Sequence, residues 1–411
     1  MQLSTAFAIL ATTLSTALAA PYPGDIVQYW NLRTTWSLNA SSPRLGSFHE
    51  GYAGAYVHTA ILAAAQDASR QPKTVQQLAV SYAAHDALNT LFSAQYQRID
   101  SYLTEIENTI TPTTSESNTG RRIGESAAVK VLRARAGDGV SKYARYDFKP
   151  AAPGVYQPTP PNNPIPASQH GGDLKPWGGV NKVPEWGPPP SPTGDDYEPH
   201  LLRIKEKGSR TNSTRTADET EIGYFWLESS ITFWNRFASV IVGESLKDDV
   251  LKSAELYARL NWAISNAGIV AFQTKNKYNA WRPITALHYT QVFLKSGNNL
   301  SDPSWEPLSP TPGHQDYLSG HAVYGGAAAE IIRRHIGSDN LTPSVTISSN
   351  VALDNVGVLS RTFTSLSQAA KENGDSRVFV GVHFQFASDE GTKAGEAAAE
   401  QVWRRNGRGY L

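Results

Sequence analysis

Three segments in the C-terminal half carry side chains that could bind an anion. The first contains Lys275 and, seven residues later, Arg282 followed by Pro283. On a helix, seven residues turn through about 700°, so these two cations would share one face about 10 Å apart along the axis. Such a pair could hold an anion from two sides, although an ordinary solvated basic face would also contain it.

The second segment is Ser319-Gly320-His321, which opens a stretch rich in alanine and glycine. Ser319 is a suitable N-cap, and the free N–H groups at a helix start form an anion site that Gly320 would let a ligand approach. His321 would then lie beside whatever the helix start binds. A normally capped helix with an incidental histidine is the alternative.

The third segment contains Arg377 and, six residues later, His383. The planar guanidinium of Arg377 suits a tetrahedral oxyanion. His383 follows Gly381 and Val382 in an otherwise apolar stretch. His383 is either a core histidine whose ring nitrogens are hydrogen-bonded within the protein or a ligand of a bound group.

Together the three segments supply the cations, donors and imidazoles that a phosphate-shaped anion requires. In order and spacing they resemble the vanadium-dependent haloperoxidases and their relatives, the type 2 phosphatidic acid phosphatases. Four upstream segments are similar to the secreted and bacterial haloperoxidase branch, so the resemblance extends over most of the chain: 52–68, 124–140, 177–180 and 209–226.

The resemblance implies that vanadate is the cofactor and that His383 is its apical ligand, the one protein atom bonded to the metal. The groups implied to hold the vanadate oxygens are Lys275, Arg282, Ser319, the N–H of Gly320, and Arg377. His321 corresponds to the acid/base group, and Lys275 to the group that polarises bound peroxide, so His321, Lys275 and His383 are the expected catalytic residues.

The activity implied by the resemblance is the oxidation of halide by hydrogen peroxide to hypohalous acid, which halogenates a small organic acceptor. His314, five residues before the serine, and Phe272, three before the lysine, correspond to the halide-side positions. A histidine at position 314 favours bromide or iodide over chloride, although His314 could simply be a loop residue beside Pro312-Gly313.

The chain departs from the family pattern at two places. Leu318 replaces the usual proline before Ser-Gly-His. Ala387 stands where an aspartate is expected four residues after the ligand histidine, and Asp389 lies two further on. The carboxylate partner of Arg377 is therefore open, with Asp218 as the candidate.

Composition excludes several other classes of function. The 411 residues contain 37 Lys and Arg against 37 Asp and Glu, which removes the electrostatic basis for nucleic-acid binding. The chain has no cysteine, which rules out a cysteine nucleophile, a Cys-ligated zinc or a disulfide framework. The single methionine is Met1. Lack of these oxidisable residues is typical of a protein beside a strong oxidant, although compositional drift would give the same result.

The N-terminus predicts secretion. Residues 1–19 match a signal peptide with alanines at positions −3 and −1, and the mature chain is expected to be one helical domain, 20–411, with its anion-binding core at about 216–411. Sequons at Asn39, Asn212, Asn299 and Asn340 fit a glycosylated surface. No apolar run reaches the ~20 residues of a membrane span, so no membrane partner is expected.

Helical periodicity dominates the rest of the chain, which predicts an all-α fold with two four-helix-bundle-like clusters. The expected helices are 54–69, 75–106, 120–136, 218–243, 246–271, 275–294, 321–335, 358–372 and 392–405. Between the clusters, residues 150–199 hold 14 of the 25 prolines and should be irregular. Tyr156, Trp177, Val180 and Trp186 favour a loop packed on the surface over a flexible linker.

Two other functions use the same residues. A secreted acid phosphatase would bind phosphate in the same pocket, with His383 as the nucleophile and His321 protonating the leaving group. A non-catalytic helical scaffold that only binds an anion is the second. Retention of the whole set of anion ligands argues against the scaffold.

Overall fold

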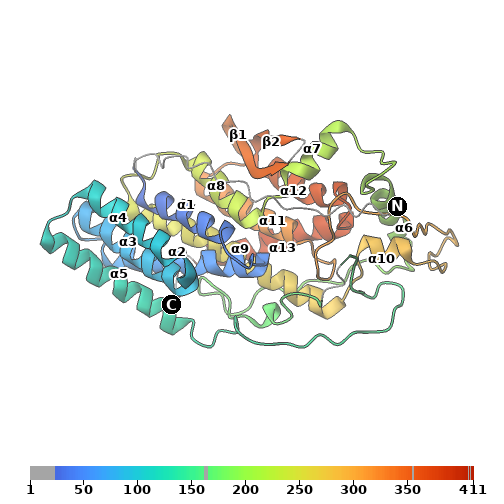
Figure 1. The fold of residues 1–411 in the computed structure, drawn as a ribbon, viewed down its shortest axis with the longest axis horizontal. Coiled ribbons are helices and arrows are strands. Elements are labelled where there is room, and N and C mark those ends of the chain that lie inside the picture. The colour runs from blue at the N-terminus through green and yellow to red at the C-terminus, as the bar shows by residue number, and fades with distance from the viewer. Residues whose placement is uncertain (1–23, 162–164, 354–355, 406, 408) are drawn as a thin grey trace, which may run out of the picture.

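The computed structural model describes residues 24–161, 165–353, 356–405, 407 and 409–411. The expected signal peptide, 1–19, lies outside these residues. The described residues form thirteen α-helices and one two-stranded sheet. The expected helical fold class is therefore confirmed. Figure 1 shows two helical groups lying end to end along the long axis.

The first bundle contains the N-terminal helices α1 (Ile26–Asn39), α2 (Ser47–Asp67), α3 (Lys73–Leu91), α4 (Tyr96–Ile110) and α5 (Thr114–Ala134). Helix α2 is alanine-rich and buried on almost its whole circumference, as expected for a helix at the centre of a bundle. It packs against α3, α5 and the long helix α9 (Val250–Tyr278). Helix α9 runs from this bundle into the second one and joins them (Figure 1).

The second bundle is built from α9, α11 (Gly320–Ile336), α12 (Leu366–Phe379) and α13 (Gln385–Arg405), with α7 (Ala217–Phe225) and α8 (Ser230–Val242) beside them. Helices α11 and α13 approach closely because small residues face each other. A Cβ atom on Gly395 would lie 2.1 Å from the carbonyl oxygen of Val323, so only glycine fits there. This packing fixes the start of α11 against the start of α13.

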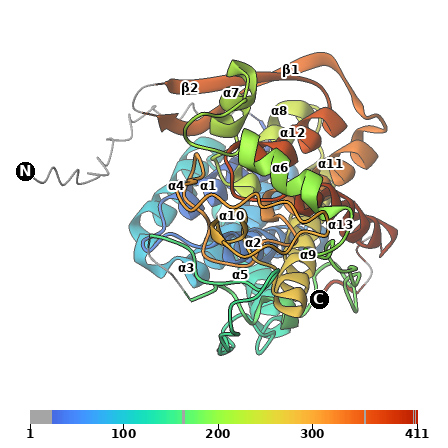
Figure 2. The same cartoon turned by 90° about the vertical axis from the view of Figure 1, so that its right-hand side faces the viewer.

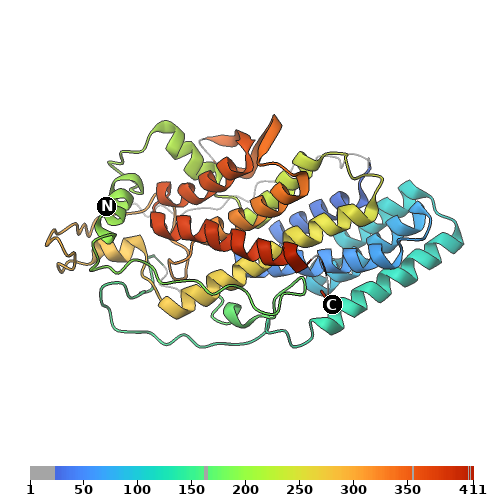
Figure 3. The ribbon, with the colours of Figure 1, turned by 180° about the vertical axis from the view of Figure 1, so that it is seen from behind.

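The proline-rich segment is irregular and packed, as expected. It contains a short 3₁₀ turn, Gly171–Asp173, and ends in α6 (Tyr197–Lys207). Tyr156, Trp177 and Val180 are buried. The amide of Asn266 bonds both backbone groups of Trp177, at 2.8 and 3.1 Å, which ties the segment to α9. Figure 3 shows the loop following the second bundle from behind.

Several expected helix boundaries are wrong. The expected helix 75–106 is broken at Phe92, and 218–243 is broken at residues 226–229. In place of a helix over 275–294, α9 ends at Tyr278 and a short α10 (Pro283–His288) follows. Helices α1 and α6 were not expected.

The expected helix 358–372 is wrong in its first half. Strand β2 (Gly357–Ser365) pairs antiparallel with β1 (Asn340–Leu353), and the helix α12 begins only at Leu366. Threonine and serine side chains meet across the two strands, Thr346 with Thr362 and Ser348 with Ser360, each at 2.7 Å. Cross-strand pairing stabilises the strand over the helix here. Figure 2 shows this hairpin lying over α7 and α12.

Among the described residues, no helix combines the length and the apolar character that crossing a bilayer requires.

Candidate active site

Helix α9 delivers Lys275 to the interior of the second bundle. The Lys275 side chain is fully buried, and its Nζ donates to the carbonyl oxygens of Gln315 (2.6 Å) and Asp316 (3.0 Å). These bonds hold the ammonium beside the segment that leads into α11. Burial lowers the pKa of Lys275 well below its usual range, and the nearby Arg282 lowers it further.

Arg282 reaches the same place without being on a helix. The expectation of one helical face for Lys275 and Arg282 is wrong, because Asn279 adopts a left-handed conformation (φ 51°) and ends α9. Pro283 then disfavours a helical conformation for the residue before it, and Arg282 is extended. Its buried guanidinium donates to the carbonyl oxygens of His314 and Val382, both at 2.7 Å.

Ser319 is the N-cap residue of α11, but its side chain makes no capping bond. The Oγ atom is buried and has no hydrogen-bond partner among the described residues. The adjacent Gly320 begins the helix, where N–H groups have no intrahelical acceptor. His321 follows, with Nε2 3.3 Å from the carbonyl oxygen of Glu228. A free hydroxyl at a helix start is suited to an anion.

Arg377 lies in the last turn of α12 and is 4% exposed. Its Nη1 donates to the carbonyl oxygen of Trp226 at 3.3 Å, while Nε is buried without a partner among the described residues. Asp218, the candidate partner, instead pairs with Arg361 of β2 at 3.0 Å. That expectation is therefore wrong, because the unexpected hairpin brings another arginine to Asp218.

His383 lies in the turn between α12 and α13. Gly381 has a φ of 81°, and a Cβ there would lie 2.4 Å from the carbonyl oxygen of Gly208, so the turn requires glycine. The His383 ring is buried, with Nε2 3.1 Å from Nη1 of Arg282. Its Nδ1 lies 2.9 Å from a carboxylate oxygen of Asp316.

Lys275, Arg282 and His383 come together around Asp316, and the charge of Arg377 is near enough to lower the pKa of His383. Ser319 and Gly320 stand three and four residues after Asp316, at the start of α11, and complete the predicted cluster. We call this cluster the anion cage. Its members are Lys275, Arg282, Ser319, Gly320, Arg377 and His383.

The anion cage is net positive. Burial lowers the pKa of Arg282 to about 10 and that of Arg377 to about 9. Among the described residues, one fully buried carboxylate, Asp316, lies within the ion-pair limit of the cage, 3.8 Å from Arg282. Burying three cations against one anion is costly unless a further anion compensates. With the unpaired Ser319 hydroxyl and Arg377 Nε, this arrangement fits a tetrahedral oxyanion such as vanadate or phosphate.

The imidazoles of the site lie in an environment that favours their neutral form. Burial lowers the pKa of His383, His321 and His314 well below the usual histidine range, and neighbouring cations add to that effect. A neutral imidazole offers one ring nitrogen with a free lone pair. Such a nitrogen can bind a metal centre or accept a proton.

The two predicted halide residues lie together at the edge of the anion cage. The rings of Phe272 and His314 meet edge to face, 5.8 Å apart. Nδ1 of His314 is 3.0 Å from Nη2 of Arg282, so His314 contacts an anion ligand directly. On its other side, Phe272 packs edge to face against Phe48 of α2.

Sequence reasoning missed two residues of the site. Asp316 is fully buried beside His383 and Arg282, and burial raises its pKa to about 7. The sequence feature that could have identified Asp316 is its position three residues before Ser319. Glu228 positions His321 through its backbone carbonyl, while its carboxylate pairs with Arg236 at 2.7 Å and accepts the Asn350 N–H at 2.9 Å. No spacing in the sequence indicates that backbone contact.

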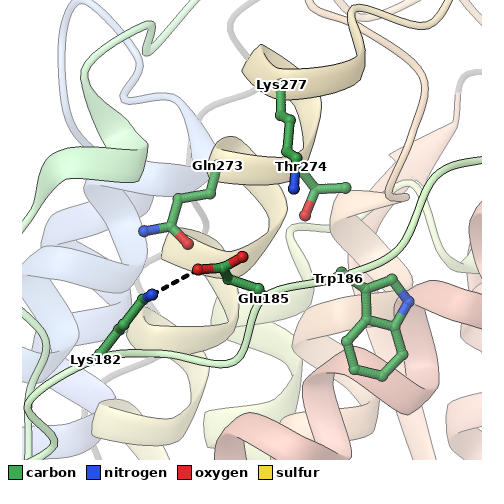
Figure 4. A pocket seen from close by; sticks show the side chains of 6 residues that line it. All are labelled: Lys182, Glu185, Trp186, Gln273, Thr274 and Lys277. Carbon is green, nitrogen blue, oxygen red and sulfur yellow. Dashed lines mark hydrogen bonds and ion pairs between the residues drawn. The ribbon is translucent and has the colours of Figure 1, made fainter.

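A separate pocket of about 270 Å³ lies along α9 (Figure 4). Its lining residues are Lys182, Glu185, Trp186, Gln273, Thr274 and Lys277, none of which belongs to the anion cage. Within the part of the chain that the structure describes, no group of three or more His, Cys, Asp or Glu side chains could hold a bare metal ion.

Comparisons with known proteins point to one family. A family model, the VCPO second helical-bundle domain, matches residues 255–409, which include every member of the anion cage. The vanadium chloroperoxidase of Curvularia inaequalis is 25% identical over 231 residues, covering 43% of this chain. That match spans only 37% of the length of the relative.

Two solved structures share the fold over almost the whole chain. A bacterial vanadium-dependent iodoperoxidase superposes with a TM-score of 0.74 at 19% identity, covering 94% of this chain and 98% of the other. A holo-type bacterial vanadium-dependent chloroperoxidase gives a TM-score of 0.70 at 16% identity, with coverage of 94% and 100%. The similarity of fold extends over both bundles.

Proposed function

We propose that the chain is a vanadium-dependent haloperoxidase, which uses hydrogen peroxide to oxidise halide at a vanadate held in the anion cage. The family model over residues 255–409 and the fold shared with two vanadium-dependent haloperoxidases support this proposal. The hypohalous acid formed would halogenate a small organic acceptor. One observation carries the proposal: three cationic side chains are buried together with a serine hydroxyl that has no hydrogen-bond partner among the described residues, and the buried ring of His383 contacts one of those cations, Arg282.

Each member of the anion cage has a role that follows from its chemistry. Bound vanadate would supply a Lewis-acidic metal centre. Lys275, Arg282 and Arg377 would bind its oxygens as fixed cations, together with the Ser319 hydroxyl and the Gly320 N–H. His383 would give its free ring nitrogen to the metal.

His321 would act as the acid/base group. It is neutral, and it lies in the first turn of α11 next to Gly320 and Ser319. It can therefore take a proton from hydrogen peroxide as peroxide enters the anion cage. The contact with the Glu228 carbonyl fixes the orientation of the ring.

For the halide, we propose bromide or iodide over chloride. The support is His314 itself, which places a polar imidazole between Arg282 and Phe272 at the edge of the anion cage. A donor beside the guanidinium suits a large, weakly hydrated halide.

We further propose that the chain is secreted and glycosylated. The support is the signal-like sequence of residues 1–19 and the exposure of all four sequon asparagines, Asn39, Asn212, Asn299 and Asn340. Glycosylation requires accessible acceptor side chains of this kind.

The second candidate is an acid phosphatase using the same anion cage. The observation that favours it is the carboxylate beside Nδ1 of His383, because a nucleophilic histidine needs its other nitrogen held. Vanadate and phosphate have the same tetrahedral shape, so binding alone does not separate the two activities.

One experiment separates them. The purified protein is incubated with orthovanadate, and peroxide-dependent bromination of monochlorodimedone is compared with hydrolysis of p-nitrophenyl phosphate. We expect bromination that requires vanadate and is suppressed by added phosphate. Hydrolysis without bromination would instead identify a phosphatase.

A further inference from the structure

We propose that Asp316 is a positioning residue for His383: it holds the imidazole with its proton on Nδ1, which leaves Nε2 free to ligate the metal. The inference rests on the proposed function, because it concerns the ligand histidine of that site.

The geometry begins with the short contact between the two side chains. Oδ1 of Asp316 lies 2.9 Å from Nδ1 of His383, and neither carboxylate oxygen has another hydrogen-bond partner among the described residues. Nη1 of Arg282 lies 3.3 Å from Nδ1 and 3.1 Å from Nε2, so a metal bound at Nε2 would replace the contact of that nitrogen with Arg282. The Asp316 side chain is fully buried and that of His383 is 4% exposed, so water does not compete for this contact.

The backbone of Asp316 is fixed on two sides. Its carbonyl oxygen accepts from Lys275 Nζ at 3.0 Å, and its N–H donates to the carbonyl oxygen of Ala280 at 3.0 Å. Both partners belong to the end of α9 and the loop after it. Asp316 is therefore positioned by the same segment that delivers Lys275 to the anion cage.

Other carboxylates that are near His383, either in the sequence or in the site, bind other residues. Asp389 is exposed and accepts from Gln385 at 2.8 Å. Glu228 is paired with Arg236. Among the described residues, Asp316 is the carboxylate within the ion-pair limit of His383.

The chemical consequence concerns the tautomer. A neutral imidazole carries one proton, and a carboxylate facing Nδ1 favours the form with that proton on Nδ1. Nε2 then keeps its lone pair. Histidines that ligate metals usually have such a partner on the second nitrogen, and removing the partner typically weakens metal binding by about 10–100-fold.

The carboxylate has an opposite effect on simple anion binding. It lies 3.8 Å from Arg282, so its negative charge opposes any anion held by that guanidinium. Phosphate needs only the cations and donors of the anion cage, whereas vanadate also needs Nε2. Loss of Asp316 should therefore weaken vanadate binding without weakening phosphate binding.

The test compares both anions on the vanadate-free protein by titration calorimetry. In Asp316→Ala we expect the Kd for orthovanadate to rise by about 10–100-fold and the Kd for orthophosphate to stay unchanged or fall. Asp316→Asn, which keeps an acceptor oxygen and disturbs folding least, should show a smaller loss of the same sign. Asp389→Ala is the matched control and should change neither Kd.

A second readout needs no vanadate. In protein labelled with ¹⁵N-histidine, the signal lost in His383→Asn identifies His383, which should carry its proton on Nδ1 in the wild type and shift towards Nε2 in Asp316→Ala. Equal changes in the two Kd values, or an unchanged tautomer, would overturn the inference. Failure of the wild type to bind vanadate would refute the proposed function, and the tautomer measurement would still test Asp316.

Discussion

Two regions of the molecule bury polar side chains but satisfy them differently: the anion cage, and the contact of α1 and α2 with α8 and α9. In the latter region, asparagine side chains bond one another and a histidine. Asn235 and Asn261 exchange amide hydrogen bonds at 3.1 and 2.9 Å, and Asn31 contacts Nε2 of His58 at 3.1 Å. These contacts join α1, α2, α8 and α9, so the network stabilises the packing of the first bundle against α8 and α9.

In the anion cage, by contrast, some polar groups have no partner within the described structure. Its cations outnumber its buried carboxylate in the described structure, and Ser319 Oγ and Arg377 Nε have no hydrogen-bond partner there. Helix α9 contributes to both regions, with Asn261 in one and Lys275 in the other. The structural region pairs amide with amide and leaves an uncharged ring nitrogen, Nδ1 of His58, without a partner, whereas the anion cage leaves cationic and hydroxyl donors that an anion would pair.

The largest difference should appear when one buried histidine is removed from each region. We expect His383→Ala to lower vanadate-dependent bromination by more than about 100-fold, because it removes the metal ligand itself. His58→Gln should leave kcat within about twofold, since His58 contacts Asn31 and Tyr257, neither of which belongs to the anion cage. Initial rates at saturating vanadate measure both. Bromination retained by His383→Ala would contradict the ligand assignment.

The next effect concerns stability. At an orthophosphate concentration of 100 times its Kd, the free energy of unfolding should rise by about 2.7 kcal/mol. In Arg377→Met this gain should be smaller, because the Kd for orthophosphate is larger. Without phosphate, the variant should be no less stable than the wild type, because it buries one uncompensated cation fewer. Urea unfolding with and without phosphate measures both. A variant that loses stability without phosphate would show that the cage is satisfied without an anion.

The first bundle should respond to pH rather than to anions. Burial lowers the pKa of His58 to about 3, against 6.5 for an ordinary histidine. Between these values the unfolded chain binds one more proton, so the free energy of unfolding falls as the pH falls, by about 1 kcal/mol from pH 6.5 to 5.5. His58→Gln should remove this contribution. Identical pH slopes in the two proteins would show that His58 is not held neutral.

The smallest effect should come from the edge of the anion cage. Replacing His314 by Phe removes a polar group beside Arg282 and keeps an aromatic ring against Phe272. We expect the ratio of kcat/KM for bromide to that for chloride to fall by about 3–10-fold, on the scale of one altered pocket contact. An unchanged ratio would remove His314 from the halide site.

Most of the predicted anion ligands lie in short motifs at a fixed distance from a helix end. Ser319 and His321 are placed by the start of α11, and Arg377 and His383 by the end of α12 and the turn after it. Local chain geometry therefore fixes most of the anion cage, and residue spacing reports on it.

The parts that depend on distant contacts were not predictable in this way. Arg282 reaches the anion cage because Asn279 ends α9, and two cations seven residues apart do not reveal that break. The pairing of Asp218 with Arg361 depends on a hairpin whose strand β2 was expected to be helical. Asp316 meets His383 across 67 residues, so no spacing rule links them.

The most direct test of the account is the position of vanadium in crystals soaked with orthovanadate, located by anomalous diffraction at the vanadium edge. The account predicts one strong peak within bonding distance of Nε2 of His383, with oxygens facing Ser319, Arg377 and Lys275. A peak outside the anion cage, for example in the pocket of Figure 4, or a cage without vanadium would contradict it.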